Sequence, residues 1–126
     1  MGLILVVEDD DDLSTMLASA IENRGHEVRV ATNGREALDR VAERMPDLIL
    51  LDIMMPVMSG AEFVARFREH YGRAALIVVM TAAESAELRA HEIGADGWLS
   101  KPFELGKLAN VLATYASPSP HARAGG

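Results

Sequence analysis

The 126-residue sequence predicts one α/β domain, an open parallel β-sheet covered by helices on both faces. The main observation is that apolar runs of strand length alternate along the chain with segments of helical period. A second observation is that three of the runs are apolar almost throughout, as is typical of strands buried on both faces. Because the alternation repeats five times with short connections, we expect a (βα)₅ order with right-handed crossovers.

The expected strands share an apolar run bounded by polar or turn residues. They are LILVV (3–7), HEVRVAT (26–32), DLILLD (47–52), ALIVVMT (75–81) and GWLS (97–100). Only the second run alternates, with Val28 and Val30 facing inward, which indicates a strand at the outside of the sheet.

The expected helices share apolar residues three and four positions apart. The apolar pattern of the first expected helix ends at Gly25, and that of the second ends before Pro46. The other three helices are expected over residues 60–71, 84–93 and 104–115. Asp11 or Asp12 is a candidate N-cap of the first helix, and Ser59 is the candidate N-cap of the third. Gly60 is expected where the backbone packs tightly beside the site.

Composition excludes several classes of protein. The formal net charge is −7, which argues against a general affinity for nucleic acid or for anionic membranes. The absence of cysteine excludes disulfides and thiolate metal sites. The run after Met1 has no basic flank and is too short to span a bilayer, so the expected location is cytoplasmic.

Polar residues collect where the expected strands end. Glu8 and Asp9 follow the first strand, Asp52 and Thr81 end the third and fourth, and the fifth runs into Lys101. Because ligands of open parallel sheets bind beyond the carboxyl ends of the strands, these side chains converge on one edge. Carboxylates held this close repel each other, and a hard cation with oxygen ligands, above all Mg²⁺, relieves the repulsion.

Each of these residues also has a purely structural interpretation. Asp52 could be an ordinary acid at a strand end, and Thr81 could be a turn residue or the cap of the next helix. Lys101 has the weakest structural explanation, because no feature nearby requires a lysine before Pro102. Together the five residues favour a functional site over five separate structural roles.

The sequence resembles the receiver domains of two-component response regulators. The segments that carry the resemblance are LVVEDD, LLDIMMPVMSG, VVMTA and GADGWLSKPF, in the order that this family uses. The resemblance covers residues 3 to about 115. It implies a doubly wound, flavodoxin-like three-layer sandwich with strand order 2-1-3-4-5.

The resemblance also implies a role for each residue of the site. Asp52 is the phosphoacceptor, attacking a phosphohistidine of a histidine kinase or histidine phosphotransfer protein. The implied Mg²⁺ ligands are Glu8, Asp9, Asp52 and the backbone carbonyl of Met54. Lys101 and the hydroxyl of Thr81 contact the phosphoryl oxygens. The protein is then no conventional enzyme, but it catalyses its own phosphotransfer and dephosphorylation.

Trp98, three residues before Lys101, is the implied switch aromatic, which moves when Thr81 moves toward the phosphoryl group. Its structural alternative is a plain core aromatic. The residues at 54 and 83 are Met54 and Ala83, which cannot orient water, so we expect slow self-dephosphorylation.

The receiver domain is expected to span residues 1–116, with 117–126 (SPSPHARAGG) a disordered tail or a truncated linker. By resemblance, a downstream protein contacts the fourth helix, fifth strand and fifth helix, and no direct contact with nucleic acid or membrane is expected. The alternative function is a binding module that signals without taking phosphate. The sequence names neither the kinase nor the target.

Overall fold

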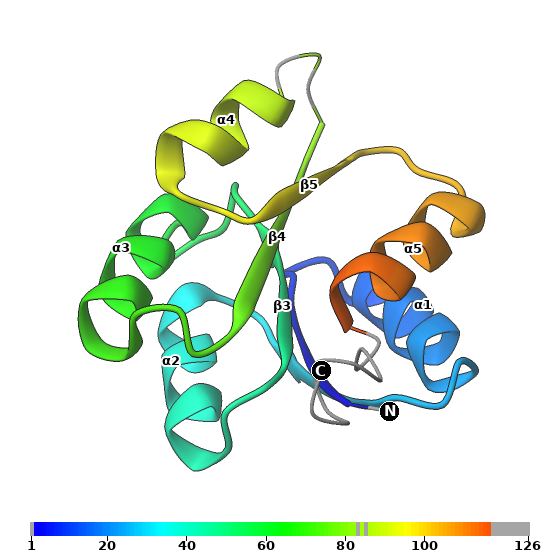
Figure 1. Cartoon of the computed structure of the whole chain (residues 1–126), viewed down its shortest axis with the longest axis horizontal. Helices are drawn as coiled ribbons and strands as arrows, with labels where there is room; N and C mark the ends of the chain where they lie inside the picture. Colours follow the sequence, from blue (N-terminus) through cyan, green and yellow to red (C-terminus); the bar gives the residue numbers. More distant parts are fainter. Residues whose placement is uncertain (1, 83, 85, 117–126) are drawn as a thin grey trace, which may run out of the picture.

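The computed structural model describes residues 2–82, 84 and 86–116, and it shows a parallel five-stranded sheet between two layers of helices (Figure 1). The strand order is β2-β1-β3-β4-β5. The predicted fold class and strand order are therefore confirmed.

The strands are β1 (Leu3–Val7), β2 (Glu27–Ala31), β3 (Leu48–Asp52), β4 (Leu76–Thr81) and β5 (Gly97–Ser100). The helices are α1 (Asp11–Glu22), α2 (Gly34–Glu43), α3 (Gly60–Tyr71), α4 (Ala86–Ile93) and α5 (Leu105–Val111), and α5 continues as a π-helical turn over Leu112–Ala116. Each expected element is present, with ends that differ by one or a few residues. None of the helices in the described ranges is long and apolar enough to cross a membrane.

The sheet divides the core into two apolar layers. The layer under α2, α3 and α4 includes Phe63 and Phe67, and the layer under α1 and α5 includes Leu17 and Ile21 (Figure 1). All residues of β1 and β3 are buried, as their continuous apolar sequences predict. Val28 and Val30 of β2 are half-buried against the α1/α5 layer, which agrees with an edge strand that has one covered face.

Helix α1 begins differently from the prediction. Its N-cap is Asp10, whose side chain accepts a hydrogen bond from the backbone N–H of Leu13. Asp11 and Asp12 lie in the first turn instead, where they favour the positive end of the helix dipole. The prediction of either as N-cap was wrong because four consecutive aspartates have the same capping propensity. The extended backbone of Asp10 decides between them.

The amino-terminal edge of the sheet is fixed by Asp96, whose side chain is only 9% exposed. Its carboxylate accepts hydrogen bonds from Nη2 of Arg68 at 2.9 Å, from Nη2 of Arg73 at 2.6 Å and from the N–H of Ile77 at 2.8 Å. The Arg68 guanidinium also donates to the backbone carbonyls of Gly72, Ala75 and Gly94. This network joins the end of α3, the start of β4 and the turn before β5.

Replacing Arg68 should therefore destabilise the fold far more than replacing another arginine of α3. Arg68→Ala leaves three carbonyls and one side of a buried carboxylate without their donor, which should lower the free energy of unfolding by about 2–4 kcal/mol. Arg66→Ala removes only an exposed pair with Glu62, so its effect should stay below about 0.5 kcal/mol. Urea unfolding followed by circular dichroism measures both, and equal effects would contradict the role of Arg68.

Candidate functional site

Three carboxylates meet at the carboxyl ends of β1 and β3. One oxygen each of Glu8, Asp9 and Asp52 lies within 4.8 Å of the other two. Glu8 is 1% exposed and Asp52 is 6% exposed, whereas Asp9 faces solvent. β1 and β3 are adjacent and parallel, so residues that end these strands must lie side by side. The structure thus brings together the three acids that the sequence predicts.

Lys101 enters this cluster from β5. Its Nζ lies 2.7 Å from Oε1 of Glu8 and 3.5 Å from Oδ2 of Asp52. The backbone N–H of Lys101 donates to the carbonyl of Thr81 at 2.9 Å, which holds the residue at the end of β4. One ammonium group therefore serves two buried carboxylates, and its shorter contact is to Glu8.

Burial and pairing shift the pKa values of this ion pair. Burial raises the pKa of Glu8 above its ordinary value, and the hydrogen bonds from Lys101 and from the N–H of Asp10 offset that effect only in part. Burial alone would lower the pKa of Lys101. The hydrogen bond to Glu8 and the charge of Asp52 outweigh it, so the pKa of Lys101 lies above its ordinary value. Lys101 is thus a permanent cation at neutral pH.

The segment after β3 is folded tightly around Asp52. Oδ1 of Asp52 accepts a hydrogen bond from the N–H of Met54 at 3.1 Å. A Cβ on Gly60 would lie 2.7 Å from the backbone oxygen of Asp52, so the start of α3 can approach the site only with glycine at this position. Ser59 caps α3 by accepting from the N–H of Glu62, as predicted. The Met54 side chain points away from this packing and is 75% exposed.

Thr81 lies on β4, the neighbour of β3, and Trp98 lies on β5, the next strand along the sheet. Thr81 ends β4, is 8% exposed and pairs in register with Ser100 of β5. Trp98 lies on β5 and is 42% exposed, so it is not a buried core side chain. Ala83 lies outside the described residues.

The loop between β3 and α3 contains a feature that the sequence gives no signal for. Val57 has φ of +68°, in the left-handed region that β-branched residues rarely adopt. The N–H of Met58 donates to the carbonyl of Pro56 at 2.7 Å, which closes a three-residue γ-turn around Val57. Met58 is buried, and its carbonyl accepts from the N–H of Gly34 at 3.3 Å. The contact of Met58 with the start of α2 therefore holds Val57 in a strained conformation.

The described residues offer a donor set that suits a hard divalent cation. All three clustered side chains present carboxylate oxygens, which Mg²⁺ prefers, and their charge of −3 exceeds the single positive charge of Lys101. The cluster therefore fits the ion that its sequence pattern predicts.

Comparison with known proteins identifies the class to which this site belongs. Residues 4–113 match the family described as "Response regulator receiver domain", so the chain belongs to the receiver domains of two-component response regulators. This family binds Mg²⁺ at an acidic cluster of the kind formed by Glu8, Asp9 and Asp52. The resemblance predicted from the sequence is confirmed.

The curated relatives that this chain matches are longer than the chain. It is 40% identical over 121 residues to the phosphate regulon transcriptional regulatory protein PhoB of Rhizobium meliloti, covering 93% of this chain and 53% of PhoB. It is 38% identical over 110 residues to the regulatory protein AtoC of Escherichia coli, covering 86% of this chain and 24% of AtoC. The chain thus spans between a quarter and about half of these relatives. The expectation of no contact with nucleic acid concerns only the 126 residues given.

Solved structures give the same fold. The chemotaxis response regulator CheY4 of Vibrio cholerae has a TM-score of 0.84 and 34% identity, over 91% of this chain and 98% of that one. The receiver domain of NtrX from Brucella abortus has a TM-score of 0.83 and 27% identity, over 92% of this chain and 99% of that one.

The raised pKa of Glu8 predicts a pH dependence of stability. Folded Glu8 holds its proton more tightly than unfolded Glu8, whose pKa is near 4.5. The folded state therefore binds more protons, and the contribution of Glu8 to stability falls as the pH rises from 4.5 through its folded pKa. In EDTA, the free energy of unfolding of the parent relative to Glu8→Gln should decrease across this window. A constant difference between the two proteins from pH 4 to pH 8 would contradict the shift.

Relieving the strain at Val57 should stabilise the protein. Val57→Gly removes a left-handed conformation that costs an L-residue about 1–2 kcal/mol, offset in part by the entropy of glycine, so we expect a gain of about 0.5–1 kcal/mol. The side chain is 79% exposed, so little packing is lost. Gly60→Ala serves as the opposite control and should destabilise, because its Cβ would meet the backbone of Asp52. A Val57→Gly protein less stable than the parent in urea would show that the turn is not strained.

Proposed function

We propose that this chain is a phosphorylation-dependent signalling switch that takes a phosphoryl group on Asp52 from a histidine kinase or a histidine phosphotransfer protein. The observation that carries the proposal is the position of the Asp52 carboxylate. It is buried at a strand end, within 4.8 Å of two other carboxylates and 3.5 Å from the Nζ of Lys101. A structural acid would be paired like Asp96, whereas Asp52 shares one lysine with Glu8.

In the proposed transfer, a carboxylate oxygen of Asp52 forms a bond to the phosphorus atom as the phosphorus–nitrogen bond of the donor phosphohistidine breaks. The imidazole leaves with the electron pair and takes a proton. Oδ1 of Asp52 accepts the Met54 N–H, and Oδ2 faces Lys101, so both oxygens are oriented before the reaction. Lys101 supplies positive charge to the phosphoryl oxygens, and Thr81 supplies a hydroxyl donor.

Mg²⁺ would be held by Asp9 directly and by Glu8 through water. Asp52 and the backbone carbonyl of Met54 would complete the protein ligands. When bound, the ion would supply positive charge that neutralises phosphoryl oxygens. The protein side chains exclude water and orient the carboxylates. Glu8 and Asp52 are buried, and hydrogen bonds from Lys101 and from backbone N–H groups fix their positions.

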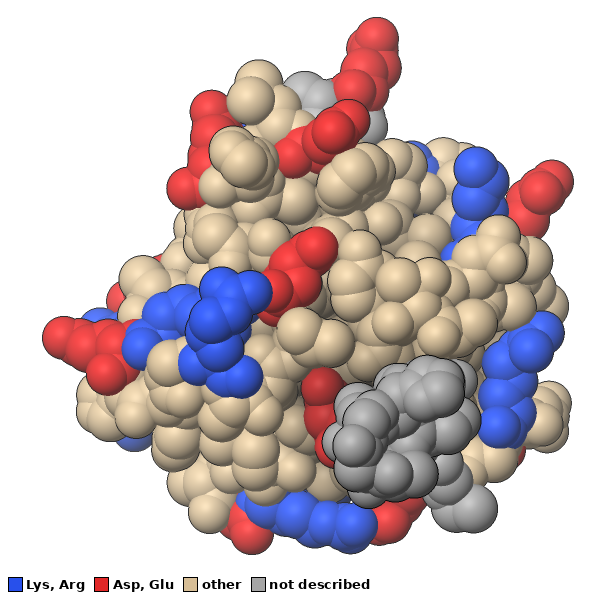
Figure 2. Space-filling model, in the orientation of Figure 1, with Lys and Arg blue, Asp and Glu red and all other residues tan. Residues whose placement is uncertain are grey.

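The proposed output begins at Thr81, which moves toward the phosphoryl group and frees space for Trp98. The 42% exposure of Trp98 supports this role, because a side chain that swings inward must first be outside. The surface that would change comprises α4, β5 and α5, and we propose that a downstream protein binds there. Figure 2 shows acidic side chains gathered over α4. We assign the switch to residues 1–116; residues 117–126 lie outside the described residues.

Phosphorylation should be seen directly by intact mass spectrometry. With acetyl phosphate and Mg²⁺, the parent should gain one phosphoryl group, and it should gain none without Mg²⁺ or as Asp52→Asn, because both remove parts of the site. Asp39→Asn, which changes an exposed aspartate of α2, is the matched control and should be phosphorylated like the parent. Trp98 is the only tryptophan, so its fluorescence should change in the phosphorylated samples alone.

No mass gain from acetyl phosphate or from a histidine kinase would overturn the proposal and leave a binding module that acts without phosphate. The decay of the mass gain in the same experiment gives the phosphate lifetime. We expect a long lifetime, because the exposed thioether of Met54 can neither donate to nor accept strongly from an attacking water.

A further inference from the structure

The start of helix α2 lies directly against the loop that joins β3 to α3. The N–H of Gly34, the first residue of α2, donates to the carbonyl of Met58 at 3.3 Å. The first N–H groups of a helix have no partner within the helix, so this donor is available for the contact. A Cβ on Gly34 would lie 2.9 Å from the carbonyl oxygen of Met58 and 2.9 Å from its Cγ. Because Gly34 has helical backbone geometry, glycine is needed here for close approach and not for conformation.

The turn between β2 and α2 is itself held firmly. Asn33 caps α2 by accepting from the N–H of Glu36 at 2.8 Å, and Oε1 of Glu36 accepts from the N–H of Thr32 at 2.7 Å. At the end of β2, the carbonyl of Ala31 accepts from the N–H of Glu8 at 3.0 Å. This turn therefore contacts the segment after β1 as well as the loop after β3, and both carry residues of the acidic cluster.

Met58 connects this contact to the residues beside Asp52. Its side chain is buried in the layer under α2, α3 and α4, and its N–H closes the γ-turn around Val57. From Met54 to Val57 the side chains are exposed or half-buried, so packing alone does not hold this part of the backbone. At the other end, the N–H of Met54 donates to Oδ1 of Asp52 at 3.1 Å. The shape of the loop thus depends on its attachment at Asp52 and at Met58.

We propose that Gly34 and Val57 are positioning residues for the Mg²⁺ site. They hold the loop so that the carbonyl of Met54 is in place before the ion binds. This inference rests on the proposed function, in which that carbonyl is a ligand. The side chain of Val57 is 79% exposed, so packing of the valine does not explain its left-handed backbone. Strained backbone is retained mainly at functional sites, and a loop that is ordered in advance loses less entropy when the ion binds.

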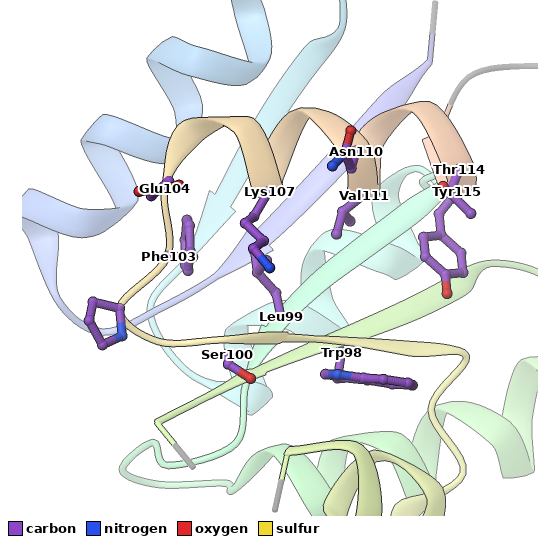
Figure 3. A pocket seen from close by; sticks show the side chains of 11 residues that line it. Trp98, Leu99, Ser100, Phe103, Glu104, Lys107, Asn110, Val111, Thr114 and Tyr115 are labelled. Atoms are coloured by element: carbon purple, nitrogen blue, oxygen red, sulfur yellow. The ribbon is translucent and has the colours of Figure 1, made fainter. Parts of the chain in front are cut away.

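A Mg²⁺ titration followed by backbone amide signals in NMR, without a phosphoryl donor, tests the role of Gly34. Gly34→Ala must displace the Met58 carbonyl, so the Kd for Mg²⁺ should rise roughly 10-fold, as when a group that orients a metal ligand is lost. Gly106→Ala is the matched control and should bind Mg²⁺ like the parent. Figure 3 shows its neighbours Glu104 and Lys107 at the start of α5, where a Cβ would meet no group of the described chain within 4 Å.

Val57→Gly separates positioning from stability. The substitution relieves strain and should stabilise the fold, but the added backbone freedom of glycine should raise the Kd for Mg²⁺ by roughly 2- to 5-fold. Val41→Ala should do the reverse, unfolding at a lower urea concentration while it binds Mg²⁺ like the parent. Val41 is buried in α2, about 10 Å along the helix from Gly34. A role in packing alone would change affinity and stability in the same direction.

A Mg²⁺ affinity equal to or tighter than that of the parent, in Gly34→Ala or in Val57→Gly, would overturn the role of that residue. The proposed function would then stand, provided that the parent binds Mg²⁺ and Asp52→Asn binds it more weakly. Urea unfolding shows whether each variant is folded, and Val57→Gly decides alone if Gly34→Ala is not. No binding of Mg²⁺ by the parent would instead overturn the metal site of the proposed function, and this inference with it.

Discussion

The contact between Lys101 and Glu8 is the interaction on which the site depends. The two residues are 93 positions apart, and their side chains meet at 2.7 Å beneath a surface that leaves Glu8 only 1% exposed. Without this cation, Glu8 and Asp52 would place two charges in a poorly solvated space, at a cost that burial alone makes large. The ammonium group offsets part of the repulsion among three acids, and the remaining negative charge makes the site suited to a divalent cation.

The opposite edge of the sheet shows what the same kinds of side chain do when their charges are balanced. Asp96 has two arginine partners and a backbone N–H, so its charge is fully compensated and the network serves stability. Asp52 shares Lys101 with Glu8 and accepts one hydrogen bond from a backbone N–H. Proteins tolerate such incomplete pairing mainly where function requires it, and the packed strands and the Asp96 network supply the stability that the site does not.

Much of this arrangement follows from sequence because parallel strands leave little freedom. Once the apolar runs are assigned, Glu8, Asp52 and Lys101 must end at one edge, and Gly60 and Ser59 are recognisable from the backbone chemistry they permit. Spacing could not predict which acid binds Lys101 most closely, because both carboxylates end adjacent strands. Nor could it predict Val57, whose left-handed backbone is imposed by contacts of Met58 with α2 and contradicts the preference of valine.

The unequal distances from Lys101 to its two partners explain how a small chemical change could become a switch. Nζ lies 2.7 Å from Glu8 and 3.5 Å from Asp52, so the lysine already stands between two acceptors. In the proposed function, a phosphoryl group on Asp52 would add charge and oxygen atoms on the side of the longer contact and would draw Lys101 away from Glu8. The backbone N–H of Lys101 donates a hydrogen bond to the carbonyl of Thr81. In the proposed switch, a shift of either residue would therefore act on β4 and β5 together, the strands that carry Thr81 and Trp98.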